Sequence, residues 1–159
     1  MVDIKKNLWI IALIAGIIGL VSLLIPAYGD VSPMGGPTLS VWFWNMYTVN
    51  GDVDFIESDL ALYDIGIATT IILIIGTFLT LLSGIRAKLK ESKTLNLILY
   101  LVGGILLLIG PIVFFGAVEA EYEGIFWDVY NINAGMVLPF IAGGLAVLVG
   151  IYGLIIQRS

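Results

Sequence analysis

Residues Ile65–Ile85 read IGIATTIILIIGTFLTLLSGI, a stretch that contains no charged residue. A helix needs about 20 mostly apolar residues to cross a hydrocarbon core of about 30 Å. Four stretches of this kind occur, namely Leu8–Ile25, Ile65–Ile85, Leu95–Val118 and Ala134–Ile156. Because the backbone in lipid must satisfy its own hydrogen bonds, each is predicted to be a helix. The sequence therefore predicts an all-α integral membrane protein, a four-transmembrane-helix antiparallel bundle.

The composition agrees with a protein embedded in lipid. Of the 159 residues, 60% are hydrophobic and 12% are charged, whereas soluble domains are about 45–50% apolar. The first stretch follows Lys5 and Lys6 as a signal peptide would, but it exceeds the about 7–15 apolar residues of a signal core. We therefore interpret residues 1–159 as one membrane domain, with loops 26–64 and 119–133 on the same side.

Charge separates the two sides of the predicted bundle. The basic residues all fall on the side of the termini: Lys5, Lys6, Arg86, Lys88, Lys90, Lys93 and Arg158. The positive-inside rule then predicts a multi-pass protein of the cell membrane with cytoplasmic N- and C-termini and extracellular loops. The loop side is acidic and lacks Lys and Arg. Nucleic acid is not expected as a partner, because this face could not neutralise phosphates.

The first extracellular loop carries signals for β-structure. Leu39–Val49 is rich in β-branched and aromatic residues, and Asn50-Gly51 follows it. Asn-Gly tolerates the positive φ angles of a type I′ turn, which predicts a β-hairpin near residues 41–56. Residues 29–38, rich in Gly and Pro, predict an irregular loop. Alternation along one continuous strand would place on one face Trp42, Trp44, Met46 and Thr48, and on the other Val41, Phe43, Tyr47 and Val49.

Aromatic and polar residues of both loops are the candidate interaction residues: Trp42, Trp44, Tyr47, Phe126, Trp127, Asp128, Tyr130 and Asn131. An isolated hairpin is marginal in water, so we expect it to pack against the second loop. Two interpretations of the aromatic side chains stay open. They form a core and anchor the protein at the membrane interface, or they form an exposed adhesive face for another copy or another protein.

Several classes of function lack the residues that they need. No ionisable residue falls at mid-membrane depth, which argues against a pump, a charged-substrate transporter or a proton channel. The absence of Cys and His removes thiol chemistry and the usual zinc, iron–sulfur and haem ligands. The spacing of Asp52, Asp54, Glu57 and Asp59 matches no calcium loop. We predict a protein that is not an enzyme and has no catalytic, cofactor or metal site.

The overall plan resembles the claudin and peripheral-myelin-protein superfamily of tetraspan proteins. The segment Phe126-Trp127-Asp128-Val129-Tyr130-Asn131 is similar to the Asp-Phe-Tyr-Asn-Pro segment of the claudin second loop. Pro111 falls where claudin third helices often carry a proline, and Trp44 or Trp42 falls near the family's Gly-Leu-Trp tryptophan. The family's cysteine pair is missing, so the Asn50-Gly51 turn has to hold the hairpin. The resemblance implies a role in cell adhesion, oligomer formation or assembly with other membrane proteins.

Three functions follow. The first is a structural, adhesive or self-assembling role through the extracellular loops, with membrane lipid and either further copies or another membrane protein as partners. The second is an accessory subunit of a larger membrane enzyme or transporter, indicated by small residues at every fourth position of several helices. The third is a pore for water or a neutral solute, for which the candidate lining residues are Thr69, Thr70, Thr77, Thr80 and Ser83.

Overall fold

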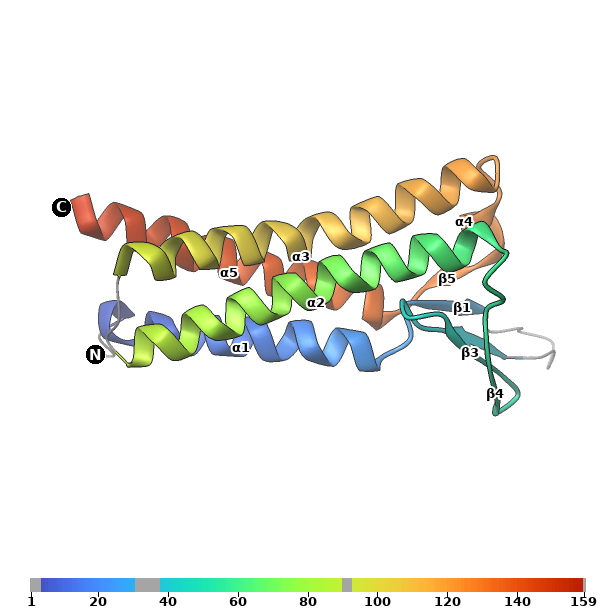
Figure 1. The fold of residues 1–159 in the computed structure, drawn as a ribbon, viewed down its shortest axis with the longest axis horizontal. Helices are drawn as coiled ribbons and strands as arrows, with labels where there is room; N and C mark the ends of the chain where they lie inside the picture. The colour runs from blue at the N-terminus through green and yellow to red at the C-terminus, as the bar shows by residue number, and fades with distance from the viewer. Residues whose placement is uncertain (1–3, 31–37, 90–92, 159) are drawn as a thin grey trace.

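The computed structural model describes residues 4–30, 38–89 and 93–158. The four predicted apolar helices are present in this part of the chain as α1 (Ile4–Leu24), α2 (Ala61–Lys88), α3 (Lys93–Glu121) and α5 (Ala134–Arg158). Each is long and apolar enough to cross a membrane. They lie lengthwise against one another in an elongated bundle (Figure 1). The end where α1 begins and α5 stops is called the terminal end, and the opposite end the sheet end.

Each long helix packs against two others. Helix α1 contacts α2 and α5, and α3 contacts the same two helices, which closes the bundle. Glycines permit the closest approach: a Cβ on Gly143 of α5 would lie 2.7 Å from the backbone oxygen of Gly104 of α3. On α2, a Cβ on Gly84 would meet Leu13 of α1 at 2.8 Å. Small residues at these positions therefore serve packing within the bundle.

An antiparallel sheet of five short strands caps the sheet end of the described chain. The strands are β1 (Tyr28–Asp30), β2 (Leu39–Val41), β3 (Met46–Val49), β4 (Asp52–Phe55) and β5 (Asn131–Ile132). Their order is β4-β3-β2-β1-β5. Because β1 pairs with β5, the two predicted loops share one sheet. A short helix, α4 (Phe126–Val129), precedes β5.

The structure confirms the predicted turn and corrects the strand before it. Asn50 and Gly51 join β3 to β4 with φ angles of 54° and 96°. The expected continuous strand from Val41 to Val49 is wrong, because the chain reverses at residues 42–45, where Trp42 N donates to Met46 O at 2.9 Å. Asn45 permits this reversal with φ 67°.

The face assignments of the sequence analysis change accordingly. Trp42 and Trp44 belong to the turn between β2 and β3, not to one strand face with Met46 and Thr48. In the stretch 29–38 that was expected to be irregular, Gly29 and Asp30 belong to β1. Residues 31–37 of that stretch lie outside the described residues.

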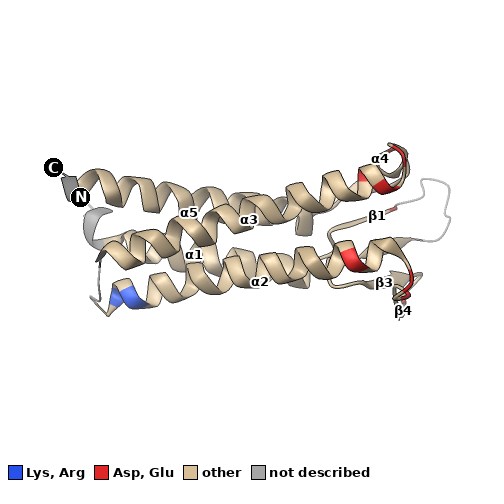
Figure 2. Cartoon of the chain, turned by 45° about the horizontal axis from the view of Figure 1, so that its top comes forward, with Lys and Arg blue, Asp and Glu red and all other residues tan. Residues whose placement is uncertain are grey.

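One apolar core joins the sheet to the bundle. Tyr28 of β1 and Phe43 of the β2–β3 turn are buried against Phe114 of α3, together with Leu73 and Leu107 deeper in the bundle. The described acidic residues gather at the sheet end, whereas basic residues lie at the terminal end (Figure 2), where the last turn of α2 carries Arg86 and Lys88. The sheet and the bundle therefore share one apolar core. The sheet end is acidic, whereas the terminal end carries basic residues.

Candidate functional site

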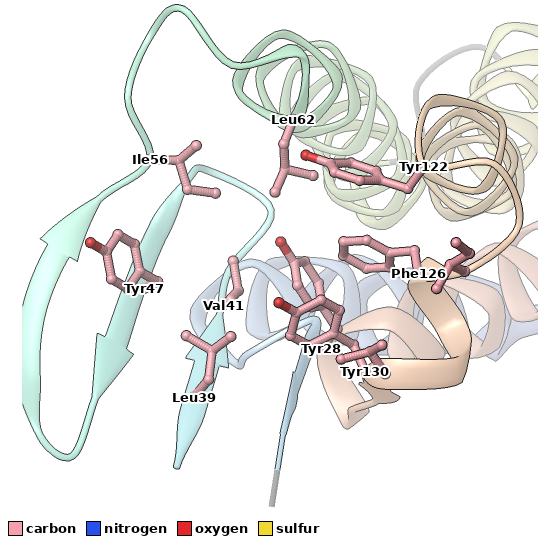
Figure 3. A pocket seen from close by; sticks show the side chains of 11 residues that line it. Tyr28, Leu39, Val41, Tyr47, Ile56, Leu62, Tyr122, Phe126 and Tyr130 are labelled. Carbon is pink, nitrogen blue, oxygen red and sulfur yellow. The ribbon is translucent and has the colours of Figure 1, made fainter. Parts of the chain in front are cut away.

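A pocket of about 420 Å³ opens at the sheet end, between the sheet, the start of α2 and the segment that follows α3. Side chains from the strands, from α2 and from the segment around α4 surround it (Figure 3). The lining residues are Tyr28, Leu39, Val41, Tyr47, Ile56, Leu62, Tyr122, Ile125, Phe126, Val129 and Tyr130. We call this site the aromatic pocket.

Tyr28 holds the two sides of the aromatic pocket together. It lies on β1, directly after the end of α1, and its ring is buried. The ring centroid is 5.2 Å from that of Phe126 and 5.8 Å from that of Tyr130. The single turn of α4 brings these two partners together, because Tyr130 N donates to Phe126 O at 3.0 Å. Edge-to-face contacts of this kind stabilise aromatic clusters beyond the area they bury.

The polar groups of the aromatic pocket are phenol hydroxyls. Burial raises the pKa of the Tyr28 hydroxyl, and the nearby Tyr130 and Tyr122 add to the rise. The pKa of Tyr47 is raised first by desolvation and then by Asp54, whose Oδ2 accepts a hydrogen bond from the Tyr47 hydroxyl at 3.4 Å. The hydroxyls of Tyr28 and Tyr47 are therefore protonated at physiological pH and can donate hydrogen bonds.

The walls of the aromatic pocket are suited to binding an apolar group. The described residues that line it include no Asp, Glu, Lys, Arg or His, and their polar side-chain groups are phenols. Its volume falls in the range of about 300–1,000 Å³ that is typical of sites for small apolar groups. Apolar and aromatic walls with a few hydroxyl donors suit an apolar or aromatic group with a hydrogen-bond acceptor at its edge.

Of the eight residues predicted for interaction, Tyr47, Phe126 and Tyr130 line the aromatic pocket. The two tryptophans of the first loop are instead half-buried against α1. The indole Nε1 of Trp42 donates to Leu24 O at 3.0 Å, and that of Trp44 donates to Leu23 O at 2.8 Å. Both therefore satisfy carbonyls at the end of α1, which a helix terminus leaves without partners.

The other three predicted residues lie beside the aromatic pocket. Trp127 stacks on Phe115 with ring centroids 4.8 Å apart, and its Nε1 donates to Phe115 O at 3.3 Å. Asp128 of α4 is exposed. Asn131 is also exposed and pairs with Gly29 across the β1–β5 ladder.

Tyr28 and Asn45 were not among the residues predicted for the site, although both position it. Tyr28 lies in a short link after the first apolar stretch, where its small-residue neighbours gave no sign of a strand. Asn45 is buried; its Nδ2 donates to Tyr63 O at 2.8 Å, and its O accepts from Ile56 N at 2.9 Å. An Asn within an aromatic run is a signal for a positive φ angle.

No family model and no curated protein matches the sequence. The geometry and chemistry of the aromatic pocket are therefore the basis for a functional proposal.

Proposed function

We propose that this chain is a non-enzymatic tetraspan membrane protein that self-associates through the aromatic pocket in a structural or adhesive role. The observation that carries the proposal is the apolar rim of the pocket. Ile125 and Val129 line the pocket and are still 58% and 54% exposed. Exposed apolar surface next to a concave apolar site is typical of protein–protein contact. The resemblance to the claudin and peripheral-myelin-protein superfamily implies the same kind of role and is part of this proposal.

The proposal includes an orientation in the cell membrane, with the sheet end outside and the termini in the cytoplasm. Arg86 and Lys88 support it through the positive-inside rule, because they lie in the last turn of α2, at the end of the bundle opposite the acidic sheet end (Figure 2). Because the chain has no cysteine, a maleimide reacts only with the cysteine that is introduced, and labelling reports the accessibility of that position. On intact cells a membrane-impermeant maleimide should label Asp59→Cys and spare Leu89→Cys, and the reverse pattern would contradict the orientation.

Contact through the pocket is favoured over pairing of strand edges. Strand β4 is the outer strand on one side of the sheet, and all four of its residues are exposed. Its Asp52 and Asp54 would place like charges opposite each other or nearby if two β4 strands paired. Charges on an edge strand discourage such pairing. An apolar side chain of a second copy, seated between Ile125 and Val129, meets no such repulsion.

The test uses Ile125→Asn and Val129→Asn, which place an amide on the rim. Ile132→Asn is the matched control, because Ile132 is an exposed apolar residue of β5 outside the pocket lining. Native mass spectrometry of protein extracted from its membranes in mild detergent gives the copy number. Loss of about 1.4 kcal/mol weakens association tenfold, and we expect at least this for each rim variant. Rim variants that assemble as wild type would overturn the proposal.

The same measurement decides between self-association and an accessory role, since an accessory subunit would emerge with foreign chains in fixed ratio. The small residues at every fourth position, from which the accessory role was predicted, pack against neighbouring helices of the same chain. A Cβ on Gly16 of α1, for example, would lie 2.5 Å from the side chain of Leu81 of α2. Two of the five candidate pore-lining residues form hydrogen bonds within their own helix instead of facing a pore. Thr80 donates to Gly76 O at 2.8 Å and Ser83 to Thr80 O at 2.7 Å, within their own helix. Flux of water or a neutral solute through vesicles that contain the protein would support the pore.

A further inference from the structure

The β3–β4 hairpin has two chemically different faces. The ladder pairs Met46 with Phe55 and Thr48 with Val53, and paired residues point to the same side of a sheet. On this side Val53 and Phe55 are 61% and 58% exposed. The opposite side carries Asp54, bonded by the Tyr47 hydroxyl. We call the side of Met46, Thr48, Val53 and Phe55 the apolar hairpin face.

The apolar hairpin face is turned toward the end of α1. The rings of Phe55 and Trp44 are 6.2 Å apart. Trp44 in turn donates through its indole to Leu23 O, and Trp42 to Leu24 O. These contacts place the face on the side of the sheet where α1 ends. The hairpin itself reaches sideways past α1 (Figure 1).

The end of α1 marks the level of the membrane surface on the sheet side. Helix α1 has 21 residues, or about 30 Å at 1.5 Å per residue, which matches the hydrocarbon thickness. Helices α2 and α3 extend further at the sheet end (Figure 1). The projecting turns carry Asp64 of α2 and Glu119 and Glu121 of α3. Charged residues of this kind belong outside the hydrocarbon.

We propose that the apolar hairpin face is a lipid-contact surface that rests on the membrane leaflet nearest the sheet. Leu24, the last residue of α1, is 68% exposed and extends the lipid-facing surface of that helix up to the hairpin. The indoles of Trp42 and Trp44 lie at this junction, and tryptophan concentrates at membrane interfaces. The aspartates of β4 lie on the other face, where water solvates them. This inference does not depend on self-association.

The occupant is lipid rather than a second protein because the face continues the lipid-exposed surface of α1. Its acidic neighbours further predict no preference for anionic lipid, since like charges repel. Phosphatidylcholine is therefore the lipid for the test. Nanodiscs that contain one copy of the full chain exclude a second copy as the cause of any protection.

The experiment places a spin label at single cysteines along β4, using Val53→Cys and Phe55→Cys with Asp52→Cys and Asp54→Cys as controls on the opposite face. All four positions are exposed, so the labels fit without repacking the core. Accessibility to oxygen, which concentrates in lipid, is compared with accessibility to a water-soluble nickel complex. We expect a several-fold higher oxygen-to-nickel ratio at 53 and 55 than at 52 and 54.

Three results would overturn the inference. Equal ratios at all four positions would place the face in water. Protection at 53 and 55 from both reagents would mean that the face packs on protein. Protection that develops only in vesicles crowded with copies, and not in single-copy nanodiscs, would identify a second copy as the occupant. If the label at one of positions 53 and 55 lowers the stability measured by thermal unfolding, the oxygen-to-nickel ratio at the other position is sufficient to test the inference.

Discussion

The ring of Phe43 meets the ring of Phe114 edge-on, with centroids 5.2 Å apart and planes at 86°. Phe43 comes from the turn between β2 and β3, and Phe114 from the part of α3 inside the bundle. Both side chains are buried. Core packing therefore holds the sheet on the bundle, because the chain has no cysteine that could form a disulfide bond.

This contact predicts a large loss of stability when it is removed. Phe43→Ala should lower the free energy of unfolding by about 3–5 kcal/mol, the usual cost of truncating a buried phenylalanine. The control is Phe55→Ala, at an exposed position, which should cost less than about 1 kcal/mol in detergent. Denaturant unfolding followed by circular dichroism measures both. Equal effects of the two variants would show that Phe43 does not hold the sheet.

Replacing Asn45 by Ala or by Gly should lower the stability of the protein by different amounts. Asn45→Ala removes the amide donor to Tyr63 O and forces Ala into a φ angle of 67°. Asn45→Gly removes the same donor but accepts that angle. We expect Ala to be less stable than Gly by about 1 kcal/mol, because a left-handed residue with a Cβ costs about 1–2 kcal/mol. Thermal unfolding of both proteins checks the order, and a more stable Ala variant would contradict the turn geometry.

Adjacent glycines of α5 provide a test of helix packing. A Cβ at Gly143 would lie 2.7 Å from Gly104 O, a backbone atom that moves only if α3 moves. At Gly144 nothing lies within 4 Å of that Cβ. Gly143→Ala should lower the melting temperature. Gly144→Ala should leave it unchanged or raise it, since Ala favours a helix over Gly by about 1 kcal/mol.

The buried phenol of Tyr28 predicts a loss of stability in alkali. Its pKa is raised above the usual value of about 10, first by burial and then by Tyr130 and Tyr122. The unfolded chain therefore releases this proton at lower pH than the folded chain. The stabilisation is complete below about pH 10 and declines as the pH rises from there.

Tyr28→Phe isolates this contribution because it keeps the ring and removes the hydroxyl. At pH 7 the variant should unfold within about 1 kcal/mol of wild type. Between about pH 9 and about pH 11, the melting temperature of wild type should fall more steeply than that of the variant. Parallel curves for the two proteins would show that the Tyr28 hydroxyl stays accessible to water.

Local sequence was informative wherever structure depends on neighbours along the chain. The apolar runs predicted all four long helices because lipid crossing requires about 20 apolar residues in a row. The structure extends them, so that α2 begins at Ala61 and α3 ends at Glu121. Asn50-Gly51 predicted the β3–β4 turn because few other pairs accept two positive φ angles.

Long-range contacts were beyond such reasoning. Strand β1 pairs with β5, which lies far along the chain, only because α1 and α5 are packed side by side. The residues that line the aromatic pocket come from three separate segments of the chain, so no single sequence motif could predict it. The turn at Asn45 was missed because its aromatic neighbours favour a continuous strand.

The sequence by itself determined that the chain forms four apolar helices and that its charges divide between two ends, because hydrophobicity and charge are properties of each residue. Tertiary structure alone decided that Trp42 and Trp44 bond the end of α1, that Tyr28 joins the two loops, and that Val53 and Phe55 share a face with Trp44. These relationships depend on the register of the sheet and on helix packing, which bring together residues that are distant in the chain.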